Sequence, residues 1–115
     1  MPNPPLEANV RKNNNVAIID LKGEIDSFAD AALNEAYAQA SQTKPTRIIL
    51  NFKNVDYINS TGIALIVGLM AQSRKAGIKF IATCLSEHYV EIFKITRLSD
   101  FMGIFSDESA ALASA

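Results

Sequence analysis

The sequence is poor in the residues that build crosslinks and metal sites. It contains one cysteine, Cys84, and one histidine, His88, in 115 residues. A single cysteine cannot form a disulfide within the chain, and one cysteine with one histidine cannot supply the usual ligands of zinc. Cys84 ends an apolar stretch, which predicts a buried, unreactive thiol, and His88 has the position of a surface or capping residue. We therefore expect no metal site and no cofactor.

An excess of charge of one sign is also lacking. Eleven Lys and Arg residues against twelve Asp and Glu residues give a formal net charge of −1. Nucleic acids and anionic membrane surfaces attract proteins through an excess of basic residues, so neither partner is expected. The longest apolar run, 62–71, is about half of the ~20 residues that span a bilayer, and residues 1–10 lack the apolar core of a signal peptide. These absences predict a cytoplasmic protein with no direct membrane insertion.

The sequence motifs of common enzyme classes are missing as well. There is no Gly-x-Gly-x-x-Gly loop, no Gly-Lys-Ser/Thr phosphate loop and no Gly-x-Ser-x-Gly pattern around Ser60. Asp26 and Asp56 cannot be established as an acid–base pair from their positions. We therefore do not expect an enzyme. A domain that binds a small ligand at the end of a parallel sheet stays open as an alternative.

Apolar strands alternate with helical segments from Val16 onward. Hydrophobic residues make up 49% of the chain, which suits one folded domain over residues 6–115 after a flexible tail at residues 1–5. The expected strands are Leu6–Arg11, Val16–Leu21, Arg47–Phe52, Ile78–Cys84 and Gly103–Phe105. The expected helices are one capped by Ser27 that ends near Gln42, then Gly62–Lys75, Glu87–Ile95 and 107–113. This order predicts an α/β fold with a four- to five-stranded, mainly parallel sheet, an antiparallel edge and about four helices packed against it.

Two hydroxyl residues, Ser60 and Thr61, stand where a buried strand meets the apolar helix 62–75. The first amides of a helix lack partners within it, and the helix dipole makes that end positive. A phosphoryl group, with a charge of about −1.5 to −2, is tolerated at such an end and changes the surface that a partner meets. The same residues are typical of an ordinary helix start capped by Asn59 or Ser60, and taken alone the segment favours the cap.

The helix 62–75 has apolar residues on two sides. One side, which suits the sheet, consists of Ile63, Ile66, Val67 and Met70. Leu65 and Leu69 point nearly the opposite way. They either dock a partner or pack beneath another helix of the same chain, and the pattern does not choose between these.

Two acidic residues, Glu24 and Asp26, follow the first core strand, where Gly23 permits an unusual turn. In isolation they are typical of a solvated loop. They can also cap the next helix or accept a basic side chain from a partner.

Together these segments resemble the STAS domain, the fold of bacterial anti-sigma-factor antagonists and of the cytoplasmic tails of sulfate transporters. Leu21–Asp26 is similar to the family's Gly-Glu-Leu-Asp element. Asn59–Ile63 is similar to its Asp-Ser-Ser/Thr-Gly-Leu element, the most specific motif of the family. The order of elements and the terminal helix agree with the resemblance over nearly the whole chain.

The resemblance implies an anti-sigma-factor antagonist in a bacterial partner-switching pathway. In that family, an anti-sigma factor that is itself a serine kinase phosphorylates the first hydroxyl residue of the motif, here Ser60, with Thr61 the less favoured candidate. The unphosphorylated antagonist binds the kinase, phosphorylation releases it, and a serine phosphatase resets it. The motifs and the helix pattern place these residues at the expected partner surface: Glu24, Asp26, Asn59, Thr61, Gly62, Leu65 and Leu69.

Asn59 stands where the family usually has Asp. Asn keeps the shape and the capping capacity of Asp but removes its charge. This difference leaves an alternative, in which the chain is a non-phosphorylated STAS scaffold or a regulatory subunit of a stress-sensing or membrane lipid-transport complex. The intact Ser60, Thr61 and Gly62 favour the phosphorylated antagonist.

Overall fold

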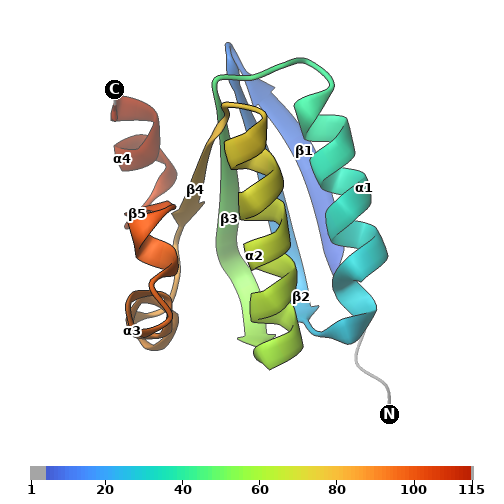
Figure 1. Cartoon of the computed structure of the whole chain (residues 1–115), viewed down its shortest axis with the longest axis vertical. Coiled ribbons are helices and arrows are strands. Elements are labelled where there is room, and N and C mark those ends of the chain that lie inside the picture. Colours follow the sequence, from blue (N-terminus) through green and yellow to red (C-terminus); the bar gives the residue numbers. More distant parts are fainter. Residues whose placement is uncertain (1–4, 115) are drawn as a thin grey trace.

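The structure is a computed structural model that describes residues 5–114. A five-stranded mixed sheet forms its centre (Figure 1). Its strands lie side by side in chain order: β1 (Glu7–Asn13), β2 (Val16–Ile25), β3 (Arg47–Ile58), β4 (Lys79–Thr83) and β5 (Gly103–Phe105). β1 is antiparallel to β2, and all other neighbouring strands are parallel. The predicted sheet with its antiparallel edge is confirmed.

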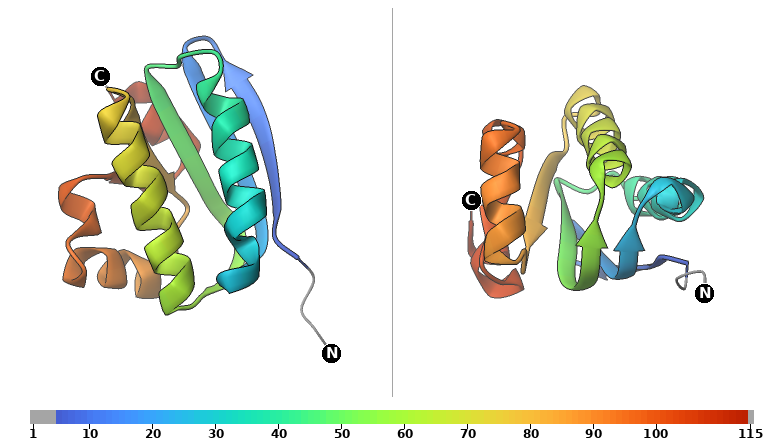
Figure 2. Two further views of the ribbon diagram at one scale, coloured as in Figure 1. Left: turned by 45° about the vertical axis from the view of Figure 1, so that its right-hand side comes forward. Right: turned by 90° about the horizontal axis from the view of Figure 1, so that it is seen from below.

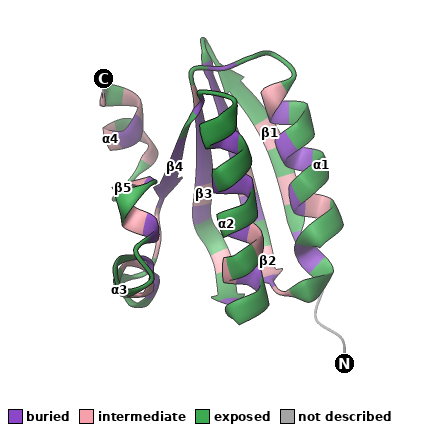
Figure 3. Cartoon of the chain, viewed as in Figure 1, coloured by how far each residue is buried: buried purple, intermediate pink, exposed green. Residues whose placement is uncertain are grey.

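Within residues 5–114, three helices connect the parallel strands and a fourth follows β5. They are α1 (Asp30–Ser41), α2 (Ser60–Lys75), α3 (Glu87–Ile95) and α4 (Glu108–Ala113), with two single 3-10 turns, η1 (Ser27–Ala29) and η2 (Leu98–Asp100). α1 and α2 lie next to each other over one face of the sheet (Figure 2). The outward surfaces of these two helices are exposed, while the central strands behind them are buried (Figure 3). No helix within residues 5–114 is long and apolar enough to cross a membrane.

The first halves of the central strands β2 and β3 are mostly apolar and buried, as expected of a sheet that is covered on both faces. Alternate side chains such as Ile19 and Leu50 enter the large core beneath α1 and α2. Their neighbours Ile18 and Ile49 enter a smaller core on the other face, which Ala111 of α4 closes. The continuous apolar strands of the sequence thus serve two cores.

Two arginines of the sheet hold the short helix α4 in place. Arg11 of β1 forms ion pairs with Asp20 of β2, at 2.5 Å, and with Glu108 in the first turn of α4, at 2.6 Å. Hydrogen bonds from Arg11 hold the pKa of the Asp20 carboxyl below its ordinary value. At the other end of α4, Nη1 of Arg47 donates to the carbonyls of Ala111 and Ser114, at 2.9 and 2.6 Å. A cation at a helix C-terminus satisfies carbonyls that lack partners within the helix.

Several predicted boundaries are wrong. Ser27 does not cap the first helix; the side chain of Asp26 accepts the N–H of Phe28, at 2.9 Å, and η1 intervenes before α1 begins at Asp30. β3 does not end at Phe52 but continues to Ile58, because it stays paired with β2 through two register shifts.

Cys84 also departs from its prediction. It lies outside β4 in a left-handed conformation, with φ of 61°, and it is only partly buried. The flexible tail predicted for residues 1–5 lies, except for the exposed Pro5, outside the described residues.

Gly62 allows the first turn of α2 to touch the backbone of β2. A Cβ atom at position 62 would lie 2.1 Å from the carbonyl oxygen of Ile25, well inside van der Waals contact. A Cβ atom at Gly68, in the same helix, would meet nothing within 4 Å. The start of α2 can therefore approach β2 this closely only with glycine at position 62.

We expect Gly62→Ala to destabilise the protein by about 1–3 kcal/mol, because the added methyl group must push α2 away from β2. The matched control is Gly68→Ala, which should raise the free energy of unfolding by about 0.5–1 kcal/mol, since alanine favours a helix over glycine. Urea denaturation of the three proteins measures both changes. Equal stability of the two variants would show that the contact with Ile25 imposes no constraint.

Candidate functional site

Asn59 joins the end of β3 to the start of α2. Its backbone N–H donates to the carbonyl of Ile25, at 3.1 Å, and its carbonyl accepts the N–H of Ile63, at 3.0 Å. Its side-chain Oδ1 accepts the N–H of Gly62, at 2.8 Å. The prediction of a cap at this junction is confirmed for Asn59, and the helix begins one residue later, at Ser60.

Ser60 and Thr61 are the first two residues of α2, and both are exposed. Asn59 already binds the amides of the next two residues, Gly62 and Ile63. The amides of Ser60 and Thr61 precede the ladder of helical hydrogen bonds, so they stay available at the positive end of the helix dipole. An anion attached to either hydroxyl would therefore meet a favourable field and free N–H donors.

The ends of β2 and β3 bring the predicted acidic residues to the same end of the molecule. Glu24 lies opposite Tyr57 in the sheet, and Ile25 lies opposite Ile58. Glu24 and Asp26 are half-buried, and Asp26 caps η1, which packs against α2. The early acidic element and the Ser60 motif, more than thirty residues apart in the sequence, thus form one surface (Figure 1).

Two residues predicted for the partner surface belong to the interior instead. Gly62 is buried against β2, and Leu69 is only 2% exposed. Leu69 lines the junction of α2 with α1, near Leu33. The alternative of burial under another helix is therefore confirmed for Leu69, while Leu65 is half-buried at the same junction.

The sheet-facing side of α2 was also predicted partly wrongly. Val67, expected to face the sheet, is 39% exposed, whereas Ile66 and Met70 are buried as expected. The reason is that α1 lies beside α2 and draws the buried side of α2 toward itself, so Leu69 turns inward and Val67 turns outward.

Sequence reasoning missed two exposed aromatic residues at this surface. Phe28, in η1, is 86% exposed, and Tyr57, near the end of β3, is 52% exposed. Phe28 stands two residues after Asp26, so an aromatic residue in the turn before a helix was the available signal. Acidic residues flank both aromatics in the sequence, and segments 24–30 and 56–62 contain no Lys or Arg. The acids in these segments are Glu24, Asp26, Asp30 and Asp56.

Comparison with known proteins identifies the family. The STAS domain sequence model matches residues 7–111. The chain belongs to the STAS domain family. It is 33% identical over 100 residues to the anti-sigma-B factor antagonist of Bacillus subtilis, which covers 86% of this chain and 90% of that protein. It is 28% identical over 86 residues to the anti-sigma-B factor antagonist of Staphylococcus aureus, which covers 75% of this chain and 80% of that protein.

Solved structures share the STAS fold with this chain. The anti-sigma factor antagonist SpoIIAA in its unphosphorylated form superimposes with a TM-score of 0.68 at 23% identity, over 91% of this chain and 94% of that one. A STAS domain protein of Planctomyces limnophilus superimposes with a TM-score of 0.78 at 16% identity, over 92% and 95% of the two chains. The predicted STAS-type α/β fold is confirmed.

The family membership also bears on catalysis. Anti-sigma factor antagonists of the STAS family are not enzymes, so the prediction that this chain is not an enzyme agrees with its relatives.

Replacement of Asn59 by alanine should destabilise the protein by about 1 kcal/mol, because the N–H of Gly62 loses its acceptor at the start of α2. Asn59→Asp keeps an acceptor of the same shape and adds a negative charge at the positive end of the helix. It should therefore equal or exceed the stability of the native chain. Thermal denaturation compares the three proteins, and an alanine variant as stable as the aspartate variant would contradict the capping role.

Proposed function

We propose that the protein is an anti-sigma-factor antagonist that binds an anti-sigma-factor serine kinase while Ser60 is unphosphorylated and leaves it when Ser60 carries a phosphate. The observation that carries this proposal is the position of Ser60, an exposed hydroxyl at the start of α2 within the STAS motif. A serine phosphatase would restore the binding form, and the exchange would take place in the cytoplasm.

We expect a phosphate at Ser60 to change binding without unfolding the domain. The helix dipole and the free amides of Ser60 and Thr61 favour a negative group at this point. In the proposed complex, the nucleotide that donated the phosphate would still lie at the point of transfer. The new phosphate would then face the phosphates of that nucleotide, and burying it in the interface would also cost desolvation energy.

The aromatic residues near Ser60 supply contact area for the same partner. Binding energy in protein interfaces concentrates in a few residues, and large aromatic side chains are common among them. Phe28 and Tyr57 are exposed, and neither is part of the hydrophobic core. The acidic residues around them suit a partner whose apolar pocket has a basic rim. This arrangement extends the proposed surface beyond the motif itself.

Asn59 supports a second candidate function. A chain without the Asp that usually precedes the phosphorylated serine could serve as a non-phosphorylated scaffold, or as a regulatory subunit of a stress-sensing or membrane lipid-transport complex. In that case the surface of Phe28, Tyr57 and α2 would form a permanent contact. The two functions differ in whether binding depends on phosphate.

An anti-sigma-factor kinase with ATP should add one phosphate to the protein, at Ser60, and mass spectrometry of peptides would locate it. Thr61→Ala should still accept the phosphate, whereas Ser60→Ala should not. Ser60→Asp should weaken binding of the kinase by a factor of about ten or more, or about 1.4 kcal/mol, and Ser60→Ala should bind like the native chain. Calorimetry measures these affinities.

Equal affinities of the Ser60→Asp and Ser60→Ala variants would contradict a phosphate switch. Phosphate found only at Thr61 would move the switch by one residue. A stable complex with no phosphate on any residue would favour the scaffold function.

Phe28→Ser should weaken binding of the kinase by a factor of about ten to a hundred, since a buried aromatic anchor would be lost from the interface. The stability of the variant should stay unchanged, because this side chain is 86% exposed. Ile95→Ser is the matched control: Ile95 is 72% exposed at the end of α3, and its replacement should leave the affinity unchanged. Equal losses in the two variants would show a general effect of surface hydrophobicity rather than a specific contact.

A further inference from the structure

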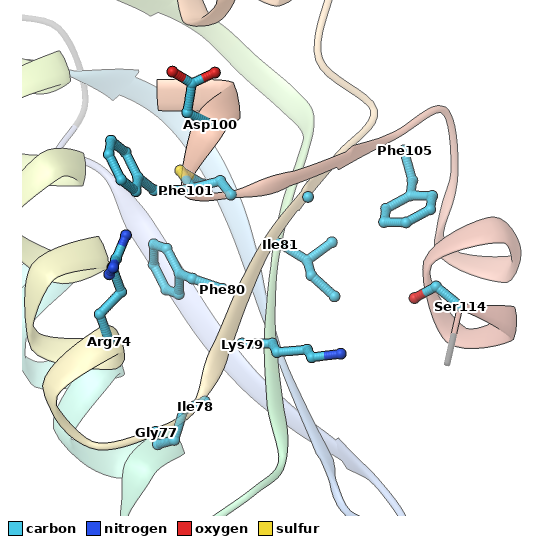
Figure 4. Close-up of a pocket in the computed structure, with 12 residues that line it drawn as sticks. Arg74, Gly77, Ile78, Lys79, Phe80, Ile81, Asp100, Phe101, Phe105 and Ser114 are labelled. Carbon is cyan, nitrogen blue, oxygen red and sulfur yellow. The ribbon is translucent and has the colours of Figure 1, made fainter. Parts of the chain in front are cut away.

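A pocket of about 510 Å³ lies at the opposite end of α2 from Ser60 (Figure 4). It forms because β5 is shorter than the strand beside it. β5 pairs with β4 only over Ile81–Thr83, so within the described residues no strand covers that edge of β4 at Lys79 and Phe80. The last turn of α2 and the segment 100–103 stand on either side of the gap. The volume lies within the range of roughly 300–1,000 Å³ typical of small-molecule sites.

Aromatic and aliphatic side chains make up much of the pocket wall. Phe80 and Met102 are each only 3% exposed, so they form a rigid part of it. Phe101, 49% exposed, stands at the opening beside Phe80, and Phe105 lies toward α4 (Figure 4). An aromatic ligand can place its ring against Phe101, the most exposed of these side chains, and remove apolar surface from water on both partners.

Arg74, at the end of α2, supplies positive charge at the mouth of the pocket. Its guanidinium carbon lies 4.6 Å from the centre of the Phe101 ring, in a cation–π contact. The ion pairs found within residues 5–114 involve Arg11 and Arg97 but not Arg74. The nearby carboxylate, Asp100, is bound by Arg97 at 2.8 Å. Arg74 is therefore held in place by a ring and keeps its capacity to bind an anion.

We propose that this pocket binds a small aromatic carboxylate, with the ring against Phe101 at the opening and the carboxylate paired with Arg74. A planar guanidinium can form two parallel hydrogen bonds with a carboxylate, and its contact with Phe101 reduces the freedom lost on binding. Because the pocket does not include Ser60 or its neighbours, the proposal is independent of the phosphate switch.

Gly103 leaves space in the part of the pocket beside Ile81 and Phe105. A Cβ atom at this position would lie 3.0 Å from the ring of Phe105 and 3.5 Å from the side chain of Ile81, and both of these residues line the pocket. A larger side chain at position 103 would therefore fill the space beside Ile81 and Phe105, which lies on the other face of β4 from Phe80. Gly103 is not among the glycines with positive φ, so other residues can adopt its backbone conformation.

The test is an NMR titration of the ¹⁵N-labelled protein with phenylacetate, and with its neutral analogue phenylacetamide, at constant ionic strength. We expect saturable shifts of the amides of Phe80, Phe101 and Gly103, with phenylacetate binding about ten times more tightly than the amide. Arg74→Gln should reduce phenylacetate to the affinity of phenylacetamide. Lys75→Gln, which removes a neighbouring positive charge outside the pocket, should leave both affinities unchanged.

Gly103→Val adds bulk beside Ile81 and Phe105, on the other face of β4, so it should leave both affinities unchanged while the amide shifts of β1, β2 and α1 stay as in the native chain, which shows that the fold is intact. If this variant does not fold, the comparison of Arg74→Gln with Lys75→Gln decides by itself. Equal affinities for the acid and the amide, or shifts scattered over exposed basic residues without saturation, would overturn the proposal.

Discussion

The close contact between the first turn of α2 and the end of β2 is the constraint on which the candidate site depends. Gly62 lies so near the carbonyl of Ile25 that no Cβ atom fits between them. Asn59 reinforces the contact, since its N–H binds the same carbonyl while its side chain caps the helix. The packing of Gly62 and the hydrogen bond of Asn59 both involve the backbone of Ile25 in β2. Ser60 therefore has a defined position relative to Glu24 and Asp26.

This packing separates two tasks within one short motif. Asn59 and Gly62 hold the helix against the sheet, whereas Ser60 and Thr61, which lie between them, face solvent. A group attached to either hydroxyl would therefore leave the core undisturbed. A helix start that presents an exposed serine suits the proposed switch, because a phosphate on Ser60 would alter the surface and leave the fold unchanged.

The sequence predicted most of the fold because its signals are local. Buried strands such as β2 and β4 are nearly continuous apolar runs, and Asn59 has the chemistry of a cap, so these elements were predicted within a few residues. Boundaries failed where partners distant in the sequence decide them. The second half of β3 is polar and persists only because β2 pairs with it, and η1 replaces the predicted cap of Ser27.

The sequence by itself determined the α/β fold, the STAS family and the position of Ser60 at a helix start, because each depends on residue order within a segment. The tertiary structure decided which side chains face outward. α1 packs beside α2 and buries Leu69, the turn η1 leaves Phe28 exposed, and the short β5 opens a pocket beside Arg74. The burial of Leu69, the exposure of Phe28 and the pocket all depend on which helices and strands pack against each other. The side-chain periodicity of one segment does not reveal which other segment will pack against it.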